Sequence, residues 1–158
     1  MTRSVLLREI TLSDLAHFYE QQLDPEAIYL AAFTAKDPGN KAAFLAHWAK
    51  VLDDQAVILR TVVSEDKVAG HIACHRWFGE PEISYWLGRE FWGQGIATMA
   101  LSAFLKEATV RPLFARVAKD NLASIRVLEK CGFKQTGEDK GFSNARGYEV
   151  EEYILTLE

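Results

Sequence analysis

A glycine-rich junction is the part of the sequence best suited to hold an anionic ligand. It runs from Trp92 to Thr98 (WGQGIAT), between a strand-like stretch and an apolar-faced helical stretch. Small residues let several backbone N–H groups point into one concavity, and a helix start adds partial positive charge. These features favour a phosphate or pyrophosphate group. A tight strand-to-helix corner that needs glycine for its backbone geometry would give the same pattern.

Two familiar phosphate-binding motifs do not match this junction. The Walker pattern GxxxxGK[ST] needs a lysine after its glycines, and none follows before Lys106. A dinucleotide fingerprint needs GxGxxG, but the stretch that begins at Gly93 ends in Thr98, and the preceding strands look antiparallel. The junction is therefore neither of the common phosphate loops.

A second group of chemically capable residues is His71, Cys74 and His75. On a strand the two histidines would share one face while Cys74 points to the other, so the three cannot converge on one metal ion. Structural or substrate-facing histidines are the simpler interpretation, and we expect no metal site. Cys74 and Cys131 lie far apart, which indicates reduced thiols rather than a disulfide framework.

The composition indicates a single globular domain over residues 1–158. Apolar residues make up 49% and charged residues 25% of the chain. With 18 Lys and Arg against 22 Asp and Glu, the net charge of −4 argues against a nucleic-acid surface. The chain start lacks the apolar core of a signal peptide, and no apolar run approaches the roughly 20 residues of a membrane span. We expect a cytoplasmic protein that binds neither nucleic acid nor membrane.

The elements that must position the junction form an α+β order with a mixed sheet. Alternating and β-branched patterns predict strands over 4–10, 56–63, 68–77, 82–88, 113–118 and near 133–137 and 148–157. Helical spacing predicts helices that begin after Ser13, Asp24 and Asn40, and two more over 93–108 and 121–131.

The junction resembles motif A of the GCN5-related N-acetyltransferase (GNAT) superfamily, [Q/R]xxGx[G/A]. Trp92 takes the first position of that motif, Gly95 the fourth and Ala97 the sixth. Tryptophan departs from the usual first residue, and this departure resembles the RimJ/RimL-type branch of ribosomal-protein N-terminal acetyltransferases. Downstream, Asn121 to Ser124 and the stretch 127–133 resemble the NxxS…vleKxGF element of the same family.

The resemblance implies a mostly antiparallel mixed sheet flanked by helices, with acetyl-CoA in a cleft where two parallel strands splay apart. It assigns cofactor binding to Leu87, Trp92, Gly93, Gln94, Gly95, Ile96, Ala97, Thr98, Asn121 and Ser124. The backbone of Leu87 would contact the pantetheine arm, and the amides of 92–98 the pyrophosphate. Asn121 is also a favoured N-cap residue, and the two roles can coexist.

The reaction that the resemblance implies is direct acetyl transfer to a primary amine, without a cysteine nucleophile. Glu82 matches the position of a base in some family members, although a solvated glutamate at a strand start is the simpler alternative. Ser124 would protonate the departing thiolate, and its alternative is an ordinary polar residue of a first helical turn.

The acceptor is left open between a protein N-terminal amine and a small amine or amino acid. Four rings in irregular segments are candidates for the acceptor pocket, although such rings also serve as lids over a core: Tyr29, Phe33, Phe142 and Tyr148. A non-catalytic acyl-CoA sensor or partner-binding module on the same fold is the alternative function. A homodimer through Trp77, Phe78 and the last strand also stays open.

Overall fold

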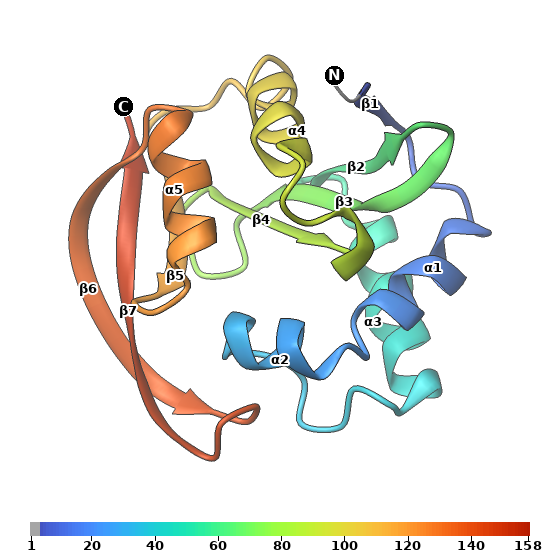
Figure 1. Cartoon of the computed structure of the whole chain (residues 1–158), viewed down its shortest axis with the longest axis horizontal. Helices are drawn as coiled ribbons and strands as arrows, with labels where there is room; N and C mark the ends of the chain where they lie inside the picture. Colours follow the sequence, from blue (N-terminus) through green and yellow to red (C-terminus); the bar gives the residue numbers. More distant parts are fainter. Residues whose placement is uncertain (1–3) are drawn as a thin grey trace.

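A computed structural model describes residues 4–158, and its elements follow the predicted order (Figure 1). In chain order they are β1 (Leu6–Arg8), α1 (Asp14–Gln21), α2 (Pro25–Ala31), α3 (Lys41–Asp53), β2 (Ile58–Ser64), β3 (Lys67–His75), β4 (Glu82–Leu87), a 3₁₀ turn (Arg89–Phe91), α4 (Ile96–Phe104), β5 (Leu113–Ala118), α5 (Leu122–Lys130), β6 (Lys134–Ser143) and β7 (Tyr148–Leu157). The predicted helices and strands are therefore all present, with shifts at their ends.

The strands form one seven-stranded sheet in the order β1-β2-β3-β4-β5-β7-β6. Every neighbouring pair is antiparallel except β4 and β5, which run parallel. That parallel pair is in register only at Glu82 and Phe114, after which the two strands diverge, as Figure 1 shows. The mixed, mostly antiparallel sheet with a splayed parallel pair is confirmed.

Of the three caps predicted for α1, α2 and α3, two work through their side chains. Asp24 accepts a hydrogen bond from the Glu26 amide at the start of α2, and Asn40 accepts one from Ala43 at the start of α3. Ser13 is the N-cap of α1 by position, but its side chain makes no capping hydrogen bond. The buried carboxylate of Asp14 instead accepts from the Thr11 amide, which fixes the chain segment just before the helix.

The helix predicted over 93–108 begins at Ile96 and ends at Phe104. Its first turn is lost because Gly93 and Gly95 have φ of +72° and +76°, outside the right-handed helical region. This difference matters for function, because the residues 92–95 become a loop that leads into a fresh helix N-terminus. The strand predicted over 4–10 is likewise shorter, at Leu6–Arg8.

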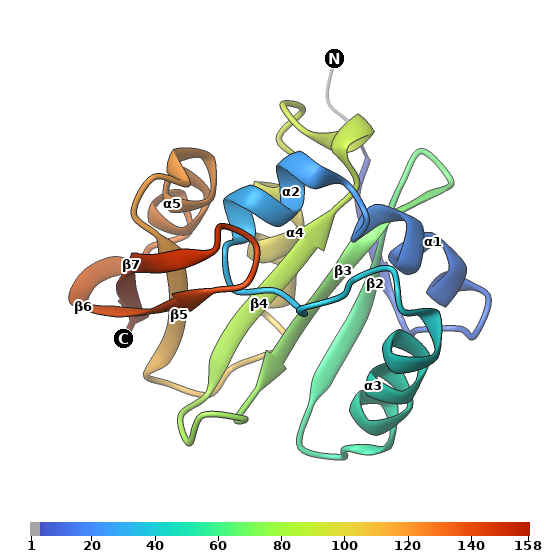
Figure 2. The same cartoon turned by 90° about the horizontal axis from the view of Figure 1, so that it is seen from below.

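The helices cover both faces of the sheet (Figure 2). Strand β3 contributes side chains to the core on each face. Ile72 and Cys74 pack in the larger core cluster with residues of α4 and α5, while Ala73 between them packs with Phe18 of α1 and Trp48 of α3. This alternation is the period of two that a strand imposes. The sheet is thereby fixed from both sides up to the point where β4 leaves β5.

Two histidines of β3 make the stability of the protein depend on pH. Burial lowers the pKa of both His71 and His75 to about 4. Below pH 6.5 the unfolded chain binds protons that the folded chain refuses, so stability falls as the pH drops from 6.5 towards 4. Each histidine contributes up to about 1.4 kcal/mol per pH unit in this window. Urea unfolding at pH 7, 6 and 5 is expected to show this loss.

Glu82 has the opposite effect, because its pKa is raised in the folded state. The folded protein takes up this one proton more readily than the unfolded chain, which stabilises it as the pH falls. Because two histidines act against one carboxyl group, the free energy of unfolding still decreases on acidification. A His71→Leu variant is expected to have a shallower pH dependence than the wild type. Stability that stays constant between pH 6.5 and 5 would contradict the assignment.

Candidate active site

The divergence of β4 from β5 opens a cleft of about 590 Å³. Because the strands pair only at Glu82 and Phe114, backbone N–H and C=O groups on the facing edges beyond this point have no partner across the gap. The cleft is lined by Ala31, Phe33, Phe78, Glu82, Ile83, Ser84, Tyr85, Trp86, Ala115, Arg116, Val117, Ala118, Asn121, Ser124, Leu128, Asp139, Lys140, Gly141 and Glu152. Three residues that the sequence singled out for chemistry or cofactor contact, Glu82, Asn121 and Ser124, therefore share one cavity.

Glu82 lies where the parallel strands begin to part, with a side chain that is 12% exposed. Its carboxylate is 3.4 Å from Nε of Arg116 and 3.7 Å from Nε2 of His75. Burial raises the pKa of Glu82 above its usual value, and the negative charge of Glu152 adds to the rise, while Arg116 lowers it. A carboxylate with a raised pKa is a better proton acceptor, which favours the base over the solvated alternative.

Arg116 organises the carboxylates of this cleft, and no motif in the sequence points to it. Its Nη1 donates to Glu152 at 2.8 Å and to Asp139 at 3.0 Å, besides the contact with Glu82. Only the register of the sheet brings these groups together, since they come from β4, β5, β6 and β7. Since Lys140 also lines the cleft, its wall holds three carboxylates against two cations and carries a small net negative charge.

Ser124 projects from the first turn of α5 into the cleft and is paired with Tyr85 of β4. The two hydroxyl oxygens are 2.8 Å apart. Burial raises the pKa of Tyr85 to about 12, so the phenol stays protonated and can donate to Ser124. No local pattern in the sequence singles out Tyr85, because its reach to Ser124 depends on the packing of α5 over the sheet.

Asn121 has the capping role that its position predicts. It is the N-cap of α5, with Oδ1 accepting from the Ser124 amide at 3.4 Å, while Nδ2 donates to the Leu30 carbonyl at 3.4 Å. The capping interpretation is confirmed. Since Asn121 also lines the cleft, the cofactor contact stays a compatible prediction.

The glycine-rich junction forms the entry to α4, with Gly95 as its N-cap. No side chain caps this helix, so the amides of its first turn, from Ile96 to Thr98, have no partner within the helix. A Cβ built on Gly93 or Gly95 would meet no atom within 4 Å, so the space beside both glycines is open. Free amides at the start of a nine-residue helix beside open space suit a phosphate group.

The side chains of the junction mostly point away from this open space. Ile96 is 1% exposed in the core, and Gln94 donates back to the Glu90 carbonyl, so both offer only their backbones. Trp92 donates from Nε1 to the Leu87 carbonyl at 3.0 Å, which braces the loop against the end of β4. Neither Leu87 nor any residue from Trp92 to Thr98 lines the 590 Å³ cleft. Their contacts with a cofactor stay predictions.

The four rings predicted for the acceptor pocket are only partly brought together. Phe33 lines the cleft, whereas Tyr29, Phe142 and Tyr148 do not. Tyr29 instead stacks on the guanidinium of Arg146, which lies 4.1 Å from its ring centroid.

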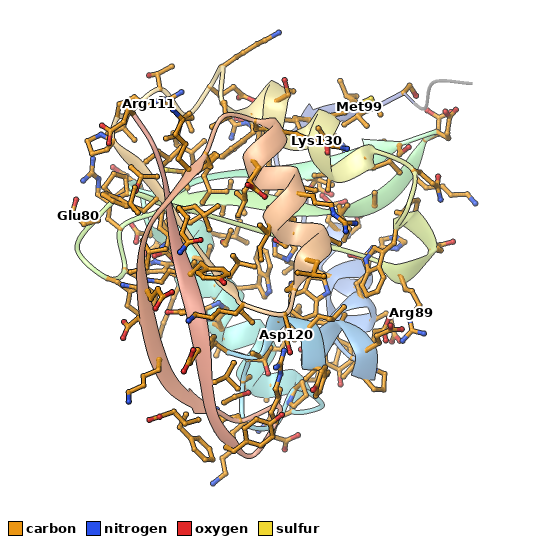
Figure 3. All side chains as sticks on the ribbon, turned by 60° about the vertical axis from the view of Figure 1, so that its left-hand side comes forward. Glu80, Arg89, Met99, Arg111, Asp120 and Lys130 are labelled. Carbon is orange, nitrogen blue, oxygen red and sulfur yellow. The ribbon has the colours of Figure 1, made fainter. Side chains whose placement is uncertain are left out.

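Arg146 ties the β6–β7 hairpin to the helices beside the cleft. Its side chain is 4% exposed and donates to both carboxylate oxygens of Asp120 and to the Tyr29 carbonyl. In Figure 3, Asp120 lies at the start of α5, next to α2. The hairpin tip, α2 and the start of α5 are thus held together beside the cleft.

The histidines of β3 pack against aromatic side chains, and neither lines the cleft. His71 packs edge-on against Phe18 and Trp48, and His75 stacks on Trp77. Among residues 4–158, no group of three or more His, Cys, Asp or Glu side chains is arranged to hold a metal ion. Within the same described range, no helix is both long and apolar enough to cross a membrane.

The residues of the predicted dimer patch are exposed, with Trp77 at 45% and Phe78 at 73%. Phe78 also lines the cleft, so its exposure has a second explanation. The homodimer stays a prediction.

Comparison with known proteins agrees with this geometry. Residues 4–134 match the family model described as acetyltransferase (GNAT) domain. The Bacillus subtilis (strain 168) protein named uncharacterized N-acetyltransferase YnaD is 29% identical over 153 residues, covering 86% of this chain and 82% of its own.

Two solved structures share the fold at lower identity. A putative phosphinothricin N-acetyltransferase has a TM-score of 0.83 at 21% identity and covers 98% of both chains. RimL, the ribosomal L7/L12 alpha-N-protein acetyltransferase in complex with coenzyme A, has a TM-score of 0.80 at 18% identity, covering 98% of this chain and 94% of its own. The chain accordingly belongs to the GNAT family of acetyltransferases and is an N-acetyltransferase.

Proposed function

We propose that the protein transfers the acetyl group of acetyl-CoA directly to a primary amine, with Glu82 as base and Ser124 as acid. The observation that carries the proposal is a half-buried carboxylate with a raised pKa in the same cleft as a hydrogen-bonded hydroxyl. The cleft lies where two parallel strands part, and the free amides at the start of α4 would hold the pyrophosphate of the cofactor.

The chemistry needs only proton transfers from the chain's own residues. Acetyl-CoA supplies an activated acyl group with a thiolate leaving group of pKa about 8.5. Glu82 takes a proton from the incoming ammonium, directly or through water, so that the free amine can attack the carbonyl. Ser124, with Tyr85 donating to its oxygen, would give its proton to the departing sulfur and regain one from the attacking nitrogen, which loses its second proton as the amide forms. A backbone N–H at the edge of β4 would steady the oxyanion.

The acceptor is expected to arrive as a cation. Three carboxylates, Glu82, Asp139 and Glu152, outnumber the two cations Arg116 and Lys140 in the lining of the cleft, and this small net negative charge favours an ammonium group over an anion. Phosphinothricin and ribosomal protein L7/L12, named for the two similar structures, differ greatly in size. A protein N-terminus and a small amine are therefore both kept as acceptors for the test.

The first experiment is isothermal titration with acetyl-CoA, followed on the same sample by thiol release with peptides and small amines. Binding with thiol release on one acceptor class supports the enzyme and identifies its substrate. Binding without release on any acceptor would instead favour the acyl-CoA sensor. Absence of binding would remove the cofactor assignment.

Replacing Tyr85 with Phe tests the hydroxyl pair. The variant removes one hydrogen bond to Ser124 and leaves the ring in place, so kcat is expected to fall by roughly 3–10-fold while acetyl-CoA affinity is unchanged. Ser124→Ala should cost more, and adding Tyr85→Phe to it should cost little, because the partner of the phenol is already gone. Independent, multiplicative losses in the double variant would show that the two hydroxyls do not act together.

A further inference from the structure

His75 lies on β3, directly opposite the proposed base Glu82 on the neighbouring strand β4. The β3–β4 register pairs His75 with Glu82, and the histidine is 2% exposed. The Trp77 backbone N–H donates to its Nδ1 at 3.5 Å, so Nδ1 must be the unprotonated ring nitrogen and the proton lies on Nε2. That Nε2 is 3.7 Å from Oε2 of Glu82, a charge–dipole contact slightly longer than a hydrogen bond.

The imidazole is held in this orientation from a second side. The Trp77 ring stacks on it with centroids 3.9 Å apart and planes inclined by 13°. Burial lowers the pKa of His75 to about 4, so the ring is neutral at physiological pH. It can therefore offer a donor to Glu82 without adding a second positive charge beside Arg116.

We propose that His75 is a positioning residue: clamped by Trp77, it directs its Nε2–H towards Glu82 and keeps that carboxylate aimed into the cleft. The proposal rests on the role of Glu82 as base. A cation in its place would stabilise the carboxylate and weaken it as a base, whereas an apolar residue would leave one oxygen without a polar neighbour. A neutral donor gives this oxygen a polar neighbour and lowers the pKa of Glu82 less than a cation would.

The other charged groups near Glu82 come from each strand on the far side of the cleft. Arg116 of β5 lies 3.4 Å from Oε1, Glu152 of β7 raises the pKa of the carboxyl, and Asp139 of β6 shares the guanidinium of Arg116. These groups are unchanged when His75 is replaced. A change in the titration of Glu82 in such a variant therefore reports on the histidine.

The tautomer can be measured on the wild-type protein. Imidazole ¹⁵N spectra at pH 7 are expected to show His75 neutral, with its proton on Nε2. A proton on Nδ1, or a charged ring at pH 7, would overturn the proposal without any substitution.

The effect on the base is read from the ¹³C carboxyl titration of Glu82, assigned by the loss of its signal in Glu82→Gln. In His75→Leu the midpoint is expected to rise by roughly 0.5–1 pH unit, because the carboxylate loses its neutral donor. His75→Gln, whose amide nitrogen reaches about as far as Nε2, should restore the wild-type midpoint. A wild-type midpoint in His75→Leu would overturn the proposal.

If His75→Leu does not fold, His75→Asn provides the same comparison, because its amide is too short to reach Glu82. Failure of this inference differs from failure of the proposed function. If Glu82→Gln keeps full transfer activity, the base assignment falls, whatever the titration shows. If Glu82→Gln is inactive and the His75 variants titrate as wild type, only the positioning role falls.

Discussion

Replacing Glu82 with Gln is expected to lower kcat/KM by about 10²–10⁴-fold, the usual contribution of a general base. The amide keeps the size of the side chain and its place beside Arg116 and His75, but it cannot accept the proton of the ammonium. Because burial raises the pKa of Glu82, the wild-type rate should also decline on the acid side at a pH above the ordinary range of carboxyl groups. Thiol release from acetyl-CoA with a reactive amine measures both effects.

Acetyl-CoA binding to the same variant separates chemistry from folding. We expect the dissociation constant to change by less than about threefold, because Glu82 begins β4, whereas the junction proposed to hold the pyrophosphate follows the other end of that strand. Glu80→Gln is the matched control: it removes an exposed carboxylate two residues away and should leave kcat/KM unchanged. Full activity in Glu82→Gln would show that another group, or water alone, accepts the proton.

Replacing Gly95 with Val is expected to weaken acetyl-CoA binding by on the order of 10²-fold. Gly95 is the N-cap of α4 with φ of +76°, and a branched side chain would occupy the open space beside the first-turn amides. Loss of one or two hydrogen bonds to an anionic phosphate corresponds to about 3 kcal/mol, hence the size of the effect. Isothermal titration with acetyl-CoA is the direct measurement.

Gly147→Val is the control for backbone strain. Gly147 has the same φ of +76° and equally open surroundings, but it lies in the turn between β6 and β7. Both variants should lose stability through the strained backbone, by about 1–2 kcal/mol or more. Only Gly95→Val should lose the cofactor. Equal acetyl-CoA affinities in the two variants would show that the junction is only a strand-to-helix corner and does not bind the cofactor.

Much of the fold was accessible from local sequence patterns. Asp24-Pro25 and Asn40 were identified as helix starts because a cap is decided by one side chain and the amides two or three residues later. The parallel pair could be inferred only through the family resemblance, since the turn and strand signals of β4 and β5 do not state which neighbour each strand takes. The hydrophobic spacing predicted a helix from residue 93, but α4 begins at Ile96. Hydrophobic spacing carries no information on the positive φ angles of Gly93 and Gly95.

By itself, then, the sequence determined the type of chemistry: a glycine-rich helix start, a glutamate at a strand start, and an asparagine and a serine one helical turn apart. These are local features, and local chemistry fixes them. The tertiary structure alone decided what surrounds them.

Sheet register places Arg116 and His75 beside Glu82, and helix packing brings Tyr85 to Ser124. The buried guanidinium of Arg146 joins the β6–β7 hairpin to α2 across more than 100 residues. Contacts between residues so far apart in the chain depend on how whole elements pack and which strands pair, and no short stretch of sequence records that outcome.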